Sequence, residues 1–299
     1  MRRDQLTADA ALLFVAAIWG ATFVMVQDAV TGFPVFAFLA MRFSLASLAL
    51  LPFLLRSRPA PPAPVPRPAA STRLAAALPG ILIGAALFAG YAFQTFGLRE
   101  TTPAKAGFIT GMSVVLVPLG QAIFLRRPPR RNSLIGVALA AIGLALLSLQ
   151  ADLTLSRGDL LVLACAMAFA AHILLMGRYA PDWQPLRLAF VQIVTVALLS
   201  AAAALLLEQP IGRPAGGVWF AAAFTGLLAT ALAFFAQSRA QQATSPTHTA
   251  LIFASEPIFA GLFSFLLIGE LLGPRQLAGS ALIVAGMVIS EVRTKRDGR

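Results

Sequence analysis

The chain has few charged residues and almost no cysteine. Only 12% of its 299 residues are Asp, Glu, Lys or Arg, about half the share that is usual in a soluble domain. Cys165 is the single cysteine, which excludes an internal disulfide and any zinc pattern built on cysteine pairs. These shortages exclude a disulfide scaffold and argue against a soluble globular domain.

The motifs of catalysis are also missing. The chain has two histidines, no His-Glu-x-x-His, no Gly-x-Ser-x-Gly and no phosphate-binding loop, so it lacks the residue patterns of metalloproteases, serine hydrolases and ATP-binding proteins. We therefore predict that the protein is not an enzyme, that it holds no metal and no cofactor, and that it works without an ATPase subunit.

Hydrophobic residues fill the space that the charges leave. They make up 59% of the chain, and they gather in runs of roughly 17–25 residues, the length that crosses a bilayer as a helix. The sequence predicts an all-α integral membrane protein with ten transmembrane helices around a central cavity. The expected spans are 8–27, 34–55, 74–98, 104–125, 133–149, 159–177, 186–207, 217–238, 247–268 and 275–292.

The formal charge of +11 comes from 23 Lys and Arg residues that lie mostly in the connections between these spans. No nucleic-acid-binding motif accompanies them, so the expected partner is the lipid bilayer and not nucleic acid. One set of alternating connections and ends holds seventeen basic residues and the other holds five, with Arg42 alone inside a span. The positive-inside rule then predicts a multi-pass protein of the bacterial inner membrane with both termini in the cytoplasm.

The two halves of the chain resemble each other. A shift of 143 positions aligns polar and glycine residues at matching places, and five expected spans separate the copies. We therefore predict a first repeat over residues 1–149 and a second over 150–299, inserted in opposite directions, as in transporters that work by alternating access. The aligned pairs are Gln94 with Gln237, Pro103 with Pro246, Gly136 with Gly279 and Gly143 with Gly286.

Five short motifs lie at characteristic places along the spans: Trp19-Gly20, Arg42, Thr102-Pro103, Ser245-Pro246 and Gly269-Glu270. In these residues the chain resembles the EamA-type repeats of the drug/metabolite transporter superfamily. The resemblance implies a ten-helix transporter of small metabolites, most similar to bacterial amino-acid exporters. The first repeat departs from the pattern, because it carries Arg126 and Arg127 where the second has Gly269 and Glu270.

Two charged residues are expected deep within spans, Arg42 and Glu256. A charge inside the bilayer is costly and usually faces the interior of the bundle. We expect Arg42 to face a substrate carboxylate and Glu256 to face an ammonium group or a proton. The alternative is that the two residues pair with each other or cap backbone carbonyls.

Several polar and aromatic residues are further candidates for substrate contact. Their alternative role is packing and hydrogen bonding between helices. His172 and Glu256 are candidate proton relays, although His172 also fits a buried core histidine. Pro118 and Pro257 are candidate hinges, since proline removes a backbone donor from a helix. The candidate substrate-binding residues are Trp19, Arg42, Tyr91, Gln94, Thr110, Ser113 and Glu256.

One acid, one base and aromatic residues favour an amphipathic zwitterion as the substrate. We therefore expect a secondary transporter that exports aromatic and other neutral amino acids. Purines, nucleosides, sugars and cationic drugs remain alternative substrates, and a channel-like protein is the alternative from another class.

Overall fold

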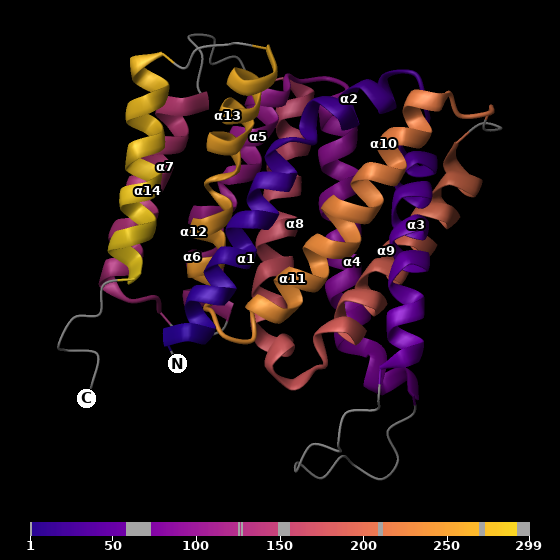
Figure 1. Cartoon of the computed structure of the whole chain (residues 1–299), viewed down its shortest axis with the longest axis horizontal. Helices are drawn as coiled ribbons and strands as arrows, with labels where there is room; N and C mark the ends of the chain where they lie inside the picture. The colour runs from indigo at the N-terminus through magenta and orange to yellow at the C-terminus, as the bar shows by residue number, and fades with distance from the viewer. Residues whose placement is uncertain are drawn as a thin grey trace.

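The computed structural model describes residues 2–57, 73–124, 126, 128–148, 156–208, 212–268 and 273–291. Within these residues the fold is entirely helical (Figure 1). Gly269, Glu270 and the proline-rich 58–72 segment lie outside the described residues. The α-helices are α1 Arg2–Gly20, α2 Phe23–Thr31, α3 Val35–Arg56, α4 Arg73–Leu98, α5 Pro103–Gly111, α6 Ser113–Phe124, α7 Arg131–Ser148, α8 Arg157–Tyr179, α9 Pro185–Leu207, α10 Gly216–Gly226, α11 Ala233–Ala240, α12 Pro246–Phe253, α13 Glu256–Ile268 and α14 Pro274–Glu291. A 3-10 turn, η1 Ala180–Asp182, precedes α9, and a π-helical turn, η2 Leu227–Leu232, joins α10 to α11.

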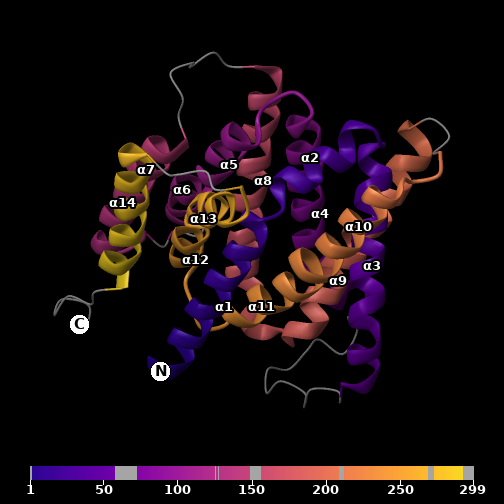
Figure 2. The ribbon, with the colours of Figure 1, turned by 45° about the horizontal axis from the view of Figure 1, so that its top comes forward.

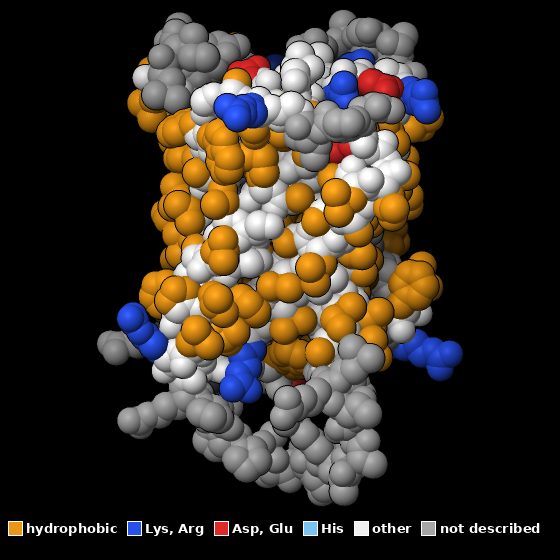
Figure 3. Space-filling model, turned by 90° about the vertical axis from the view of Figure 1, so that its right-hand side faces the viewer, with side chains coloured by type: hydrophobic (Ala, Val, Ile, Leu, Met, Phe, Trp, Pro, Cys, Tyr) orange, Lys and Arg blue, Asp and Glu red, His pale blue; other side chains and the backbone are white. Residues whose placement is uncertain are grey.

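The outer surface is apolar over the height of the bundle. Figure 3 shows a band of hydrophobic side chains between two ends that carry the basic residues. Among the described residues, seven helices are long and apolar enough to cross a membrane. Helix α7 adds a shorter apolar stretch, Arg131–Leu146. The protein is therefore a multi-pass membrane protein, and the count of ten spans stays a prediction.

The helices pack as two groups on either side of the bundle centre. Helix α3 lies along α9, and α4 lies between α8 and α9, while α7 and α14 pair at the opposite side (Figure 1). Helix α1 runs between them against α11 and α13 (Figure 2). Helix α1 begins and α14 ends at the same face of the bundle.

Several predicted spans are broken where we expected continuous helices. Helix α1 gives way to α2 at Ala21 and Thr22, α5 to α6 at Met112, and α12 to α13 at Ala254 and Ser255. At two of these breaks a side-chain hydroxyl donates a hydrogen bond to a backbone carbonyl. Thr22 Oγ1 donates to the Trp19 carbonyl (2.8 Å) and Ser255 Oγ to the Ile252 carbonyl (2.6 Å). Such local bonds compete with the helical ladder and bend or end a helix.

The Thr-Pro and Ser-Pro motifs are helix starts. Thr102 caps α5 by accepting the Lys105 N–H (3.2 Å), and Ser245 caps α12 by accepting the His248 N–H (3.2 Å). Each cap is followed by a proline at the first helical position, where its missing N–H leaves no helical bond unmade. The two motifs therefore do the same work at corresponding positions of the two halves.

Glycines allow α7 and α14 to touch through their backbones. A Cβ atom on Gly136 would lie 2.5 Å from the Gly286 carbonyl oxygen, and one on Gly143 would lie 2.5 Å from that of Gly279. The order of these contacts shows that the two helices run antiparallel. The 143-residue shift relates Gly136 to Gly279 and Gly143 to Gly286. Gly136 therefore contacts the counterpart of Gly143, and Gly143 contacts the counterpart of Gly136.

Candidate functional site

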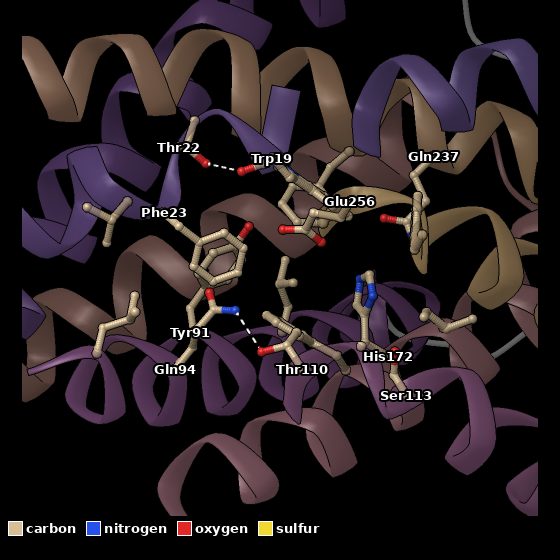
Figure 4. Close-up of a pocket in the computed structure, with 18 of the residues that line it drawn as sticks. Trp19, Thr22, Phe23, Tyr91, Gln94, Thr110, Ser113, His172, Gln237 and Glu256 are labelled. Carbon is tan, nitrogen blue, oxygen red and sulfur yellow. Dashed lines mark hydrogen bonds between the residues drawn. The ribbon is translucent and has the colours of Figure 1, made fainter. Parts of the chain in front are cut away.

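A cavity lies at the centre of the bundle, where the helix breaks meet. Its wall is built from α1, α2, α3, α4, α5, α6, α8, α11, α12 and α13. Eight residues predicted for substrate contact or proton relay all line it: Trp19, Arg42, Tyr91, Gln94, Thr110, Ser113, His172 and Glu256. Figure 4 shows seven of these labelled side chains around one space. The structure therefore brings together residues that are up to 237 positions apart in the sequence.

Arg42 is buried among neutral partners. Its Nε donates to Thr230 Oγ1 (2.8 Å), and its Nη2 donates to Tyr91 Oη (3.2 Å) and to the Ala229 carbonyl (3.4 Å). The guanidinium also lies over the Tyr91 ring, 4.6 Å from its centroid, a favourable cation–π contact. Among the described residues Arg42 makes no ion pair, so the alternative of an Arg42–Glu256 pair is wrong for this structure. The guanidinium does contact a backbone carbonyl, as the other alternative expected.

The carbonyl that Arg42 meets belongs to the π-helical turn Leu227–Leu232. Such turns interrupt the regular helical ladder and recur at functional sites. The Ala229 carbonyl also accepts the indole N–H of Trp19 (2.8 Å). The π turn thus holds α1 and α3 together through Trp19 and Arg42, which both line the cavity. Sequence reasoning missed this element, because the turn contains neither proline nor glycine.

Small residues let the neighbouring backbones approach this point. A Cβ atom on Gly226 would lie 2.7 Å from the Arg42 carbonyl oxygen, and one on Gly20 would lie 2.6 Å from the Glu256 carbonyl oxygen. The Trp19-Gly20 motif therefore has two physical roles. Trp19 satisfies a carbonyl of the π turn, and Gly20 seats the end of α1 against the start of α13.

Glu256 begins α13 directly after the break at Ala254 and Ser255. We had expected Glu256 near the middle of a continuous helix over 247–268, and the break before it contradicts that expectation. Within the described part of the chain it takes part in no ion pair, and its carboxylate points into the cavity toward Tyr91 and Gln237 (Figure 4). Glu256 and Ser113 occupy corresponding positions under the 143-residue shift, and both follow a helix break.

Aromatic rings form much of the remaining wall. Tyr91 meets Phe43, Phe169 and Phe234 edge to face, with ring centroids 5.1, 5.3 and 6.2 Å apart. Trp19 packs against Phe253 at 4.9 Å. Phe169, Phe234 and Phe253 were not among the predicted site residues. The chain has 22 phenylalanines, and phenylalanine is common in membrane-spanning helices, so the sequence alone does not mark which of these rings turn inward.

Polar side chains on α4 and α5 are bonded to each other. Gln94 Nε2 donates to Thr110 Oγ1 (3.3 Å), as Figure 4 shows. Ser113 lines the cavity one residue after the break at Met112. These residues therefore present hydrogen-bonding groups to the cavity and also join α4 to α5.

The position of His172 is compatible with both of its expected roles, the proton relay and the buried core histidine. It lines the cavity, and one ring nitrogen lies 2.8 Å from Gln192 Oε1. Gln192 in turn donates to Ser238 (3.3 Å). His172 is thus a buried, partnered histidine at the cavity wall, and proton relay through it stays a prediction.

The two candidate hinge prolines sit differently from each other. Pro257 is the second residue of α13 and follows the break, whereas Pro118 lies inside α6, buried and six residues after the break at Met112. The observed interruption in the first half therefore precedes its proline instead of coinciding with it. Hinge motion at either residue stays a prediction.

A multi-pass helical membrane protein with broken helices around a buried polar cavity defines the class of membrane transporters. The comparisons with known proteins make the assignment more specific. The model of the EamA-like transporter family matches residues 6–149 and again 156–291. The chain belongs to the EamA-like transporter family.

Individual relatives agree with this assignment over nearly their full length. An uncharacterized transporter of Archaeoglobus fulgidus is 34% identical over 97% of this chain and 87% of its own. The uncharacterized transporter YyaM of Bacillus subtilis is 25% identical over 93% of this chain and 91% of its own. A crystal structure with 18% identity superposes with a TM-score of 0.77 and covers 99% of this chain and all of its own, which supports the fold alone. The protein is a transporter and not an enzyme.

Proposed function

We propose that the protein exports aromatic and other neutral amino acids across the bacterial inner membrane. The observation that carries the proposal is that one cavity holds both a basic and an acidic side chain that form no ion pair within the described part of the chain. Arg42 and Glu256 both line it, and neither has an oppositely charged partner among the described residues. A zwitterion supplies the missing charge to each. The resemblance of the sequence to the aromatic amino-acid exporter YddG supports the same substrate class.

The aromatic wall agrees with the proposed side chain of the substrate. Trp19, Tyr91 and Phe253 present ring surface beside the two charges, and aromatic pairs gain both from apolar burial and from edge-to-face contact. Sugars and phosphate esters would call for more amides or for several cations. Among the described residues that line the cavity, Arg42 is the one lysine or arginine.

We propose alternating access between two inverted repeats as the mechanism. Three features support the repeats: the matching caps at Thr102 and Ser245, the breaks at Met112 and Ser255, which are 143 positions apart, and the reciprocal glycine contacts of α7 and α14. Rocking of one half against the other would expose the cavity to each side in turn. The basic asymmetry of the sequence supports cytoplasmic termini.

Counterflow in proteoliposomes tests the proposed function. Vesicles loaded with unlabelled phenylalanine should accumulate external labelled phenylalanine transiently, and leucine should compete. A sugar, a purine nucleoside and a quaternary ammonium compound serve as matched competitors at equal concentration. Counterflow driven by one of these and absent for amino acids would refute the proposed substrate. A linear, non-saturating flux would favour a channel instead.

A further inference from the structure

Gln237 of α11 carries an unpaired hydrogen-bond acceptor at the cavity wall. The residue is fully buried, at 0% exposure, and lines the cavity. Its Oε1 is one of four buried side-chain atoms without a hydrogen-bond partner in the part of the chain that the structure describes. The other three belong to Gln184, Ser200 and Thr244, which do not line the cavity. A buried acceptor without a donor is costly, and a site that keeps one calls for an explanation.

The orientation of this amide is fixed by its neighbours. Gln241 Nε2 donates to the Ile173 carbonyl (3.1 Å), and Gln237 Nε2 donates to Gln241 Oε1 (2.8 Å). A backbone carbonyl only accepts, so Gln241 must present its nitrogen to Ile173 and its oxygen to Gln237. Gln237 must then present its own nitrogen to Gln241. Exchanging its oxygen and nitrogen would break this chain, and Oε1 is left as the free end.

The free oxygen points to the part of the cavity where Glu256 lies. Figure 4 shows the two side chains, from α11 and α13, with their oxygens turned toward the same space. Both groups accept hydrogen bonds, and an ammonium group offers three donors and no acceptor. Arg42, in contrast, presents only donors at its own part of the wall. The cavity therefore has an acceptor region and a donor region.

We infer that Gln237 Oε1 and the Glu256 carboxylate together form the subsite for the substrate ammonium group, with Gln237 selecting for that group. This inference rests on the proposed amino-acid substrate and adds a residue that determines specificity. The carboxylate of the same substrate would lie at Arg42. Gln237 would discriminate against analogues that have hydrogen in place of the ammonium, since these leave its oxygen unpaired.

Ligand binding to the purified full-length protein tests the inference. The probes are phenylalanine, 2-phenylethylamine, which lacks the carboxylate, and 3-phenylpropionate, which lacks the ammonium. Their dissociation constants are measured by calorimetry for wild type, Gln237→Met and Gln184→Met. Gln184→Met is the matched control, because it also removes a glutamine with an unpaired buried oxygen, but away from the cavity. If Gln237→Met does not fold, Gln237→Asn, which keeps the amide and withdraws it by one methylene, replaces it.

The expected result is selective. Gln237→Met should raise the dissociation constants of phenylalanine and 2-phenylethylamine by about tenfold or more, the loss expected for one hydrogen bond to a charged group. The dissociation constant of 3-phenylpropionate should stay unchanged. Equal weakening of all three probes, or of none, would overturn the inference. Wild-type binding of 2-phenylethylamine that depends on Gln237, without counterflow of any amino acid, would keep the subsite and refute the proposed function. If neither phenylalanine nor 2-phenylethylamine binds to the wild-type protein, both the subsite inference and the proposed function are overturned.

Discussion

Replacing Arg42 by methionine separates a structural role of this residue from a substrate-binding role. The change removes three hydrogen bonds to neutral partners, each worth about 1.5–3 kcal/mol because the donor is charged. It also removes the desolvation penalty of a buried cation, which is several kcal/mol. The two terms are of similar size, because no buried acid among the described residues is left behind without its partner. We expect a melting temperature within a few degrees of wild type.

Transport of a carboxylate substrate should respond much more strongly to the same change. Truncating one partner of a buried, hydrogen-bonded charge pair costs about 3–5 kcal/mol, so kcat/KM for phenylalanine counterflow should fall by at least about a hundredfold. Binding of 2-phenylethylamine, which has no carboxylate, should change little. Phenylalanine flux within twofold of wild type at equal protein levels would refute the assignment of Arg42. A large fall in melting temperature would instead show that Arg42 mainly holds α3 to the π turn.

Three further predictions test the acid, the helix pairing and the topology. Glu256→Gln keeps the shape of the side chain and should abolish counterflow at unchanged melting temperature, because among the described residues no ion pair is broken; a lower melting temperature that Arg42→Met restores would show that the two residues form a buried pair after all. Gly143→Leu should lower the melting temperature and the folded yield, since its Cβ would lie 2.5 Å from the Gly279 carbonyl oxygen, whereas Gly107→Ala, with nothing within 4 Å of its Cβ, should not; equal behaviour of the two variants would contradict the close contact of α7 and α14. In a Cys165→Ala background, a cysteine at Pro128 should react with a membrane-impermeant maleimide only after permeabilisation of cells, and one at Arg213 should react without it; the reverse pattern would invert the proposed topology.

Much of the cavity could be predicted from the sequence, because polar residues in hydrocarbon are costly enough to constrain their own position. Arg42 and Glu256 stood out as charges within apolar runs, and Tyr91 with Gln94 stood out by their helical spacing. All four line the cavity. The helix starts at Pro103 and Pro246 were equally accessible, since a hydroxyl residue before proline is a local signal that needs no tertiary context.

The partners of these residues could not be predicted in the same way. The hydrogen bond from Trp19 to the Ala229 carbonyl spans 210 positions and depends on a π turn that carries no local signal. Gln237 was aligned with Gln94, but the orientation of its buried amide and its unpaired oxygen depend on Gln241 and the Ile173 carbonyl. The phenylalanines of the aromatic wall were missed for a similar reason, because nothing local distinguishes them from the other phenylalanines among the 22 in the chain.

The helix breaks explain why the charges and the aromatic residues meet at one place. Thr22, Ala229, Ser113 and Glu256 each lie within a few residues of an interruption in the helical ladder. In a bilayer, irregular backbone is tolerated only where protein or a water-filled cavity surrounds it. Breaks in three spans and a π turn in a fourth therefore must face inward together, and the side chains at the breaks follow them. The inward position that the membrane requires of a broken helix therefore also places Ser113 and Glu256, which directly follow two of the breaks, at the cavity wall.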